Sequence, residues 1–153
     1  MQRLLFLILI VVMPLGTSCV PLINSGETAA VVEPLAGGEF NKYFPQDDGD
    51  YNVIYTQEKE GFAQAQLNFQ GAEVATLSIS DTANNPDALE KFEASDSTIA
   101  GYPATTVGAL GTAVLVAERF QVQVRAKEES FDAAQREAWL EQFDLAGLAA
   151  LGE

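Results

Sequence analysis

The 153-residue sequence contains no histidine and only one cysteine, Cys19. Without histidine, the chain can form no Ser-His-Asp triad, no imidazole proton shuttle and no histidine-ligated metal site. With a single cysteine, it can form no internal disulfide and no cysteine cluster for a metal. A folded domain in this chain must therefore be stabilised by its hydrophobic core, which about 110 residues are enough to build.

Basic residues are also scarce, since 8 Lys and Arg stand against 22 Asp and Glu, for a formal net charge of −14. A chain of this charge repels nucleic acid at long range, so we expect no nucleic-acid partner. Apolar residues make up 48% and charged residues 20%, a balance that is typical of a folded domain rather than a disordered chain. The length fits one domain.

The first 19 residues have the features of an export signal. Arg3 supplies a positive charge, residues 4–15 are almost entirely apolar, and residues 16–18 are small. The Ser18-Cys19 pair resembles the end of a bacterial lipoprotein signal, although Leu15 stands one place further from the cysteine than that family prefers. The resemblance implies a signal peptide over 1–18 and a diacylglycerol anchor on Cys19. It also implies a location on the outer face of the cell membrane, in the periplasm or at the outer membrane.

Two other interpretations of this segment stay open. Gly16 and Ser18 also suit ordinary signal peptidase, which would release a secreted protein with a free thiol. Residues 4–20 could instead remain as an uncleaved anchor, although the apolar run is shorter than the about 20 residues that a spanning helix needs. A lone cysteine directly after a small-residue site favours lipidation over both.

Behind the signal, we expect a flexible tether and then one domain. Residues 19–38 contain Pro21, Pro34 and a Gly37-Gly38 pair, with no sustained hydrophobic period. Residues 39–153 are expected to form a single α+β domain, because runs of alternating strands are each followed by a helical segment.

Alternation of apolar and polar residues predicts strands on both sides of a first helix. Strands are expected at 51–57, 62–69, 73–80, 98–107, 112–116 and 119–126. Asn85 and Pro86 predict the start of a short helix, and Ser130 is a candidate cap for a last helix over 132–143. A tight turn is expected at Ala117-Glu118 between the last two strands. Neither residue favours positive φ, so one long strand stays open as the alternative.

The expected order is therefore βββ-α-βββ-α. It predicts a single antiparallel sheet of five or six strands with two helices packed on one face. The helices would cover the apolar side of the sheet, and its other side would face water.

That second side is expected to be polar and is the candidate binding face. Its amide side chains come from two strands, with three cations at one margin. The candidate residues are Gln64, Gln66, Asn68, Arg119, Gln121, Gln123, Arg125 and Lys127. Amides and guanidinium groups can bind carbohydrate hydroxyls, carboxylates or a polar protein surface. The simpler interpretation is the solvated face that any one-sided antiparallel sheet presents.

Other candidate sites are weaker. Asp47, Asp48 and Asp50 surround a glycine and are a weak candidate for a cation site, but Asp and Gly are also ordinary turn residues, and we expect no metal. Gly108 and Gly111 lack the Gly-Lys-Ser/Thr ending of a phosphate loop. No pair among the many carboxylates is selected as catalytic, so we expect no catalytic residue and no cofactor.

The sequence thus predicts a lipid-anchored, non-catalytic binding module of the cell envelope. Its expected partners are the membrane, through the anchor, and an envelope protein or a polysaccharide. Two alternatives stay open: an assembly or structural factor of an envelope complex, and a hydrolase that uses carboxylates or Ser/Thr. The hydrolase is disfavoured because general bases are so few.

Overall fold

The computed structural model describes residues 32–152. The predicted signal peptide, Cys19 and most of the predicted tether lie outside the described residues. The described residues form an α+β unit built on one antiparallel sheet, as the sequence predicts. No helix within 32–152 is long and apolar enough to cross a membrane.

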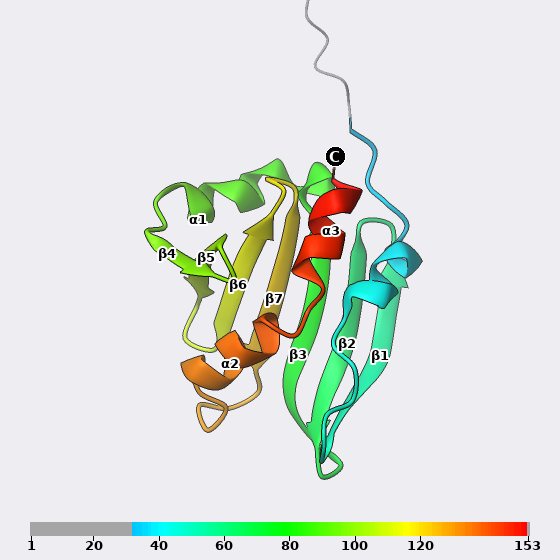
Figure 1. Cartoon of the computed structure of the whole chain (residues 1–153), viewed down its shortest axis with the longest axis vertical. Coiled ribbons are helices and arrows are strands. Elements are labelled where there is room, and N and C mark those ends of the chain that lie inside the picture. Colours follow the sequence, from blue (N-terminus) through cyan, green and yellow to red (C-terminus); the bar gives the residue numbers. More distant parts are fainter. Residues whose placement is uncertain (1–31, 153) are drawn as a thin grey trace, which may run out of the picture. The chain divides into compact units, whose positions relative to one another are not determined.

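The sheet contains seven strands within the described residues. They are β1 (Tyr51–Lys59), β2 (Phe62–Phe69), β3 (Ala72–Asp81), β4 (Ser97–Ile99), β5 (Tyr102–Val107), β6 (Gly111–Val116) and β7 (Phe120–Ala126). Their order across the sheet is β1-β2-β3-β7-β6-β5-β4, and all neighbours are antiparallel. Short hairpin connections build two meanders, which meet where β3 pairs with β7 (Figure 1).

The predicted count of five or six strands is wrong because the second half of the chain contains one more tight turn than expected. Ala100 and Gly101 have φ values of 50° and 85°, and they turn β4 back onto β5 where one strand over 98–107 was expected. The predicted turn at Ala117 and Glu118 is confirmed: these residues have φ values of 51° and 53° and join β6 to β7. Positive φ at both central residues is the geometry of a type I′ hairpin, which follows the twist of the strands.

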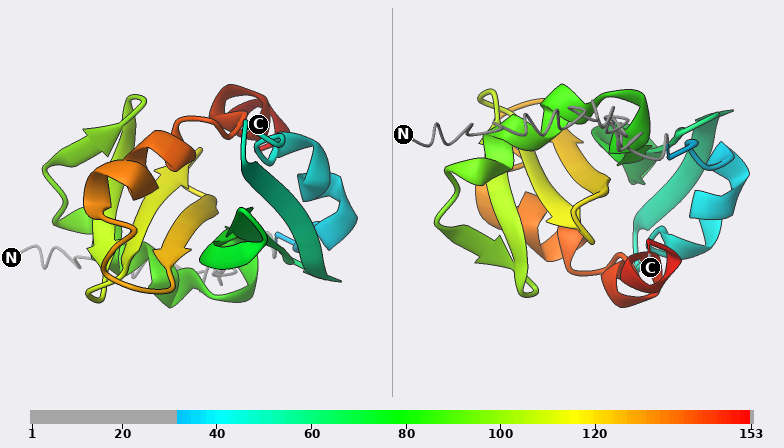
Figure 2. Two further views of the ribbon diagram at one scale, coloured as in Figure 1. Left: turned by 90° about the horizontal axis from the view of Figure 1, so that it is seen from below. Right: turned by 90° about the horizontal axis from the view of Figure 1, so that it is seen from above.

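The prediction that the helices pack on one face is also wrong. One side of the sheet carries a 3₁₀ helix, η1 (Gly37–Tyr43), with α2 (Ala133–Leu140) and α3 (Leu145–Leu151). The connection after β3 crosses to the other side as η2 (Thr82–Asn84), η3 (Pro86–Leu89) and α1 (Glu90–Glu93) (Figure 2). Phe92 of α1 is buried there, apart from the main core cluster.

The main core lies between the sheet and the three helices η1, α2 and α3. The inward positions predicted by alternation are confirmed for the central strands. The fully buried residues there are Ala63, Ala65 and Leu67 of β2, Ala75, Leu77 and Ile79 of β3, and Phe120, Val122 and Val124 of β7. A shift of the pairing by one residue would turn this apolar set outward, so burial specifies the register that brings the polar side chains together on the opposite face.

The helix predicted over 132–143 is shorter than expected and starts from a different cap, and α3 follows it as a helix that was not predicted. Asp132 accepts a hydrogen bond from the backbone N–H of Gln135, and the side chain of Gln135 accepts one from the backbone of Asp132. This capping box starts α2 two residues after Ser130, the predicted cap. Arg136 and Leu140 are buried on its inner side.

Candidate binding face

The polar residues predicted for the second side of the sheet lie in register across three central strands. Gln64 pairs with Ser78, which pairs with Gln123. In the neighbouring row, Gln66 pairs with Thr76, which pairs with Arg125. We call this surface the polar face. It consists of Gln64, Gln66, Asn68, Thr76, Ser78, Ser80, Gln121, Gln123 and Arg125. Side chains at paired positions point the same way, with Cβ atoms about 4.5–5.5 Å apart.

The middle of the polar face is open and one end is covered. Gln64, Gln66 and Gln123 are partly exposed, and Arg125 is exposed. Gln121, in contrast, is only 9% exposed. It donates a hydrogen bond from Nε2 to Oε1 of Gln123 at 3.0 Å, which links the open part of the face to the covered end.

The three cations predicted for one margin of this face are not brought together. Only Arg125 stands on the open face without an ion pair to another residue within 32–152. The ammonium of Lys127 lies 2.7 Å from Oε2 of Glu73 at the start of β3, and Lys127 is exposed while Glu73 is partly exposed. Arg119 precedes β7, and its guanidinium binds Asp81.

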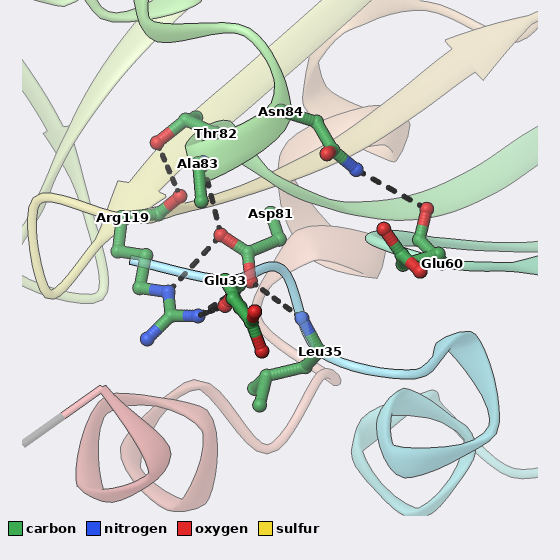
Figure 3. A network of polar contacts seen from close by, with 8 residues as sticks. All are labelled: Glu33, Leu35, Glu60, Asp81, Thr82, Ala83, Asn84 and Arg119. Carbon is green, nitrogen blue, oxygen red and sulfur yellow. Dashed lines mark hydrogen bonds and ion pairs between the residues drawn. The ribbon is translucent and has the colours of Figure 1, made fainter. Parts of the chain in front are cut away.

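Asp81 is the centre of a polar network at the end of β3 (Figure 3). Arg119 donates from Nε to Oδ1 at 3.0 Å and from Nη2 to Oδ2 at 2.7 Å. The backbone N–H groups of Leu35 and Ala83 donate to the same two oxygens, each at 3.0 Å. Burial by itself raises the pKa of Asp81. The hydrogen bonds and the charge of the guanidinium outweigh burial, so the pKa lies below its usual value.

The same network holds residues that the sequence places in the tether. Nη2 of Arg119 donates to the carbonyl oxygen of Glu33 at 3.0 Å (Figure 3). The N–H of Gly61 donates to the carbonyl oxygen of Leu35 at 2.6 Å. The chain is thus bound to the end of the sheet from Glu33 onward, ahead of the predicted domain start at residue 39. The hydrophobic periodicity of the sequence does not predict this attachment, because Glu33 and Leu35 make these hydrogen bonds with their backbone groups.

A hollow of about 270 Å³ lies next to this network, at the covered end of the polar face. We call it the Gln121 hollow. Its lining includes Lys59 at the end of β1, Glu60 in the β1–β2 turn, Phe62 of β2, Lys91 of α1 and Gln121 of β7. Oε1 of Gln121 is buried and has no hydrogen-bond partner within the described residues.

Two of the few cations of the chain line this hollow. Nζ of Lys59 lies 5.0 Å from the ring centroid of Phe62, and Nζ of Lys91 lies 5.5 Å from that of Phe92. Burial lowers the pKa of Lys91 from its ordinary value. Neither ammonium forms an ion pair with a carboxylate in the part of the chain that the structure describes. The sequence gives no indication of a site at these two lysines, since no local pattern links a hairpin tip to a helix beyond β3.

The three aspartates considered for a cation site instead serve the turn before β1. Asp47 Oδ1 accepts a hydrogen bond from the N–H of Val53 at 2.7 Å, and Asp50 Oδ2 accepts one from Nε2 of Gln70 at 3.1 Å. Asp48 forms a backbone bridge with Tyr51. Within residues 32–152, no group of three or more acidic or cysteine side chains is arranged to hold a metal ion.

Comparison of the chain with protein-family models, with curated proteins and with solved structures gives no match. The chemistry of the site therefore has to carry any functional conclusion. That chemistry is hydrogen bonding by amides and hydroxyls over the polar face, with exposed positive charge at Arg125 and two further cations at the Gln121 hollow.

Proposed function

We propose that this protein is a non-catalytic binding module of the cell envelope, held at the membrane by a lipid on Cys19. The polar face is its binding surface. The observation that carries this proposal is the pair of in-register rows, Gln64–Ser78–Gln123 and Gln66–Thr76–Arg125, in the open middle of the sheet.

These rows suit a polar, hydroxyl-rich or carboxylate-bearing partner. Each amide offers both donors and an acceptor, and a guanidinium binds a carboxylate through two parallel hydrogen bonds. Arg125 is exposed and has no ion-pair partner within 32–152, so its donors are free for a ligand. A local positive charge in a chain of net charge −14 also concentrates anionic groups at this face. An acidic polysaccharide or a polar protein surface of the envelope has this chemistry.

Charge reversal at Arg125 tests the surface. We expect Arg125→Glu to weaken binding of the full chain to isolated envelope polysaccharide and membrane-protein fractions by about tenfold or more, since one charge-assisted contact is lost and a repulsion added. Lys42→Glu is the matched control, because Lys42 is an exposed cation on η1, on the opposite side of the sheet. Equal binding by Arg125→Glu and the original protein would refute the polar face as the binding surface.

The anchor is tested separately by the intact mass of the protein extracted from membranes. A diacylglycerol adduct on an N-terminal Cys19 is the expected result. An unmodified Cys19 thiol, or a chain that retains residues 1–18, would contradict the lipid anchor and leave the binding surface untouched.

A further inference from the structure

Gln121 lines the hollow and carries a buried hydrogen-bond acceptor that has no donor within 32–152. Gln121 is 9% exposed, and its Oε1 has no partner within the described residues. Its Nε2 is already bound to Oε1 of Gln123, and this contact orients the amide. A buried carbonyl oxygen without a donor costs free energy, and a hydroxyl or N–H of a ligand placed in the hollow would remove that cost.

The walls of the hollow supply positive charge. Lys59 and Lys91 both line it and are free of ion pairs within 32–152. Of the two acids in the lining, Asp81 is neutralised by Arg119, and Glu60 lies on the same turn as Lys59. Two ammonium groups against one free carboxylate leave the hollow locally positive, which suits the carboxylate of a ligand.

The size and one wall of the hollow limit the ligand further. Phe62 is partly exposed and lines the hollow, and Nζ of Lys59 lies over its ring, so an aromatic ring and an ammonium group stand together in this wall. The volume of about 270 Å³ lies just below the range of roughly 300–1,000 Å³ that is typical of pockets for drug-sized ligands. A ligand the size of one sugar unit fits these limits.

We infer that the Gln121 hollow binds a uronate unit, free or as part of an acidic polysaccharide. Lys59 and Lys91 bind its carboxylate, Gln121 Oε1 accepts a hydrogen bond from a ring hydroxyl, and Phe62 contacts the ring. This inference rests on the proposed binding function and names the ligand class at one end of the polar face. The rest of a polysaccharide chain would then lie along the rows toward Arg125.

Calorimetric titration of the full chain with three small probes tests the inference. D-glucuronate carries both the carboxylate and the hydroxyls, D-glucose lacks the carboxylate, and acetate lacks the hydroxyls. We expect glucuronate to bind at least tenfold more tightly than either of the other two. Equal affinity for glucose and glucuronate, or no binding of glucuronate, would overturn it. An oligogalacturonate that binds more tightly than the monosaccharide identifies a polysaccharide as the source of the unit.

Two variants locate the site. Lys59→Gln changes an exposed side chain and is expected to weaken glucuronate binding about tenfold, because one charge-assisted contact is lost. Gln121→Met removes the unpartnered oxygen, and we expect it to lower glucuronate affinity by a similar factor while the melting temperature stays within a few degrees. Glucuronate binding that neither variant changes would overturn the assignment to this hollow.

The failure of this inference is distinguishable from the failure of the proposed function. Arg125→Glu acts on the open rows, and Lys59→Gln acts on the hollow. If Arg125→Glu abolishes binding to envelope fractions while glucuronate never binds, the binding module stands and the uronate assignment falls. If Arg125→Glu leaves envelope binding unchanged but glucuronate binds and Lys59→Gln weakens it, the hollow stands and the open rows are not the surface.

Discussion

Asp81 and Arg119 form a two-point ion pair at the junction between the two halves of the sheet, with Nε–Oδ1 and Nη2–Oδ2 distances of 3.0 and 2.7 Å. Asp81 ends β3 and pairs with Phe120 of β7, so the contact lies where the two meanders meet. Thr82 adds a hydrogen bond from its hydroxyl to the carbonyl oxygen of Arg119 at 2.7 Å. The carboxylate is fully buried, while the arginine side chain retains 20% of its exposure.

Loss of this carboxylate is expected to destabilise the protein strongly. Asp81→Asn leaves Arg119 with no counter-charge and weakens the contacts to Leu35 and Ala83. We expect the free energy of unfolding in urea to fall by about 3 kcal/mol. Lys127→Gln breaks the more exposed pair with Glu73 and serves as the control, with an expected loss of under about 1 kcal/mol. Similar losses of unfolding free energy in Asp81→Asn and Lys127→Gln would contradict the prediction that the Asp81 network stabilises the fold more than the exposed pair does.

The same carboxylate predicts a pH dependence. The pKa of Asp81 is lower in the folded protein than the value of about 3.9 that is usual for an unfolded chain. Its contribution to stability is therefore complete well above pH 4 and is lost as the pH falls through the folded pKa. The stability difference between the original protein and Asp81→Asn should shrink when urea unfolding is repeated from pH 7 down to pH 3. All other carboxylates are common to both proteins, so their titration cancels in this difference. A stability difference that stays constant between pH 7 and pH 3 would contradict the prediction.

The β6–β7 turn offers a stabilising substitution. Glu118 is exposed and has a φ of 53°, a left-handed conformation that costs a non-glycine residue about 1 kcal/mol. Glu118→Gly should therefore raise the melting temperature by a few degrees, which corresponds to roughly 0.5–1 kcal/mol. Ala94→Gly, at an exposed residue with a φ of −99°, relieves no such strain and should not raise it. A gain in both variants, or in neither, would contradict this explanation.

Gly37 is required where η1 packs against the β1–β2 hairpin. A Cβ atom at this position would overlap the carbonyl oxygens of Lys59 and Phe62, which are backbone atoms and cannot rotate away. We expect Gly37→Ala to lower the free energy of unfolding by about 1–3 kcal/mol in urea titration. At the neighbouring Gly38, the nearest atom to an added Cβ is the side-chain Oε2 of Glu58 at 3.4 Å, so Gly38→Ala should be tolerated. Equal losses at the two glycines would contradict the steric cause.

The strands and their inward faces could be predicted because alternation is a local signal with one physical cause. Burial of one side of β2, β3 and β7 requires an apolar residue at every second position, and that pattern stands in the sequence. The extra strand could not be predicted in this way. It comes from the turn at Ala100, which adopts positive φ against its intrinsic preference because pairing of β4 with β5 holds the turn.

The side of the sheet taken by each helix was decided by topology. Leu89 and Phe92 look like ordinary core residues in the sequence, and nothing local shows that their helical segment crosses to the polar side. That crossing covers Gln121 and forms the hollow with Lys91 in its wall. The tertiary structure also decided which of the predicted cations is free on the polar face. Arg119 is not free, because it pairs with Asp81, which is distant in the sequence.

The sequence alone determined an acidic, histidine-free α+β domain, because composition limits the available chemistry and the period of two selects strands with one buried side. It also predicts the lipid anchor at Cys19, from a motif of neighbouring residues that ends in Ser18-Cys19. Only the tertiary structure decided which polar groups meet. Pairing of β3 with β7 joins Asp81 to Arg119, and the crossing of residues 82–93 brings Lys91 to Lys59 and Gln121. Contacts between distant segments follow from the packing of the whole sheet, and no short stretch of the chain encodes them.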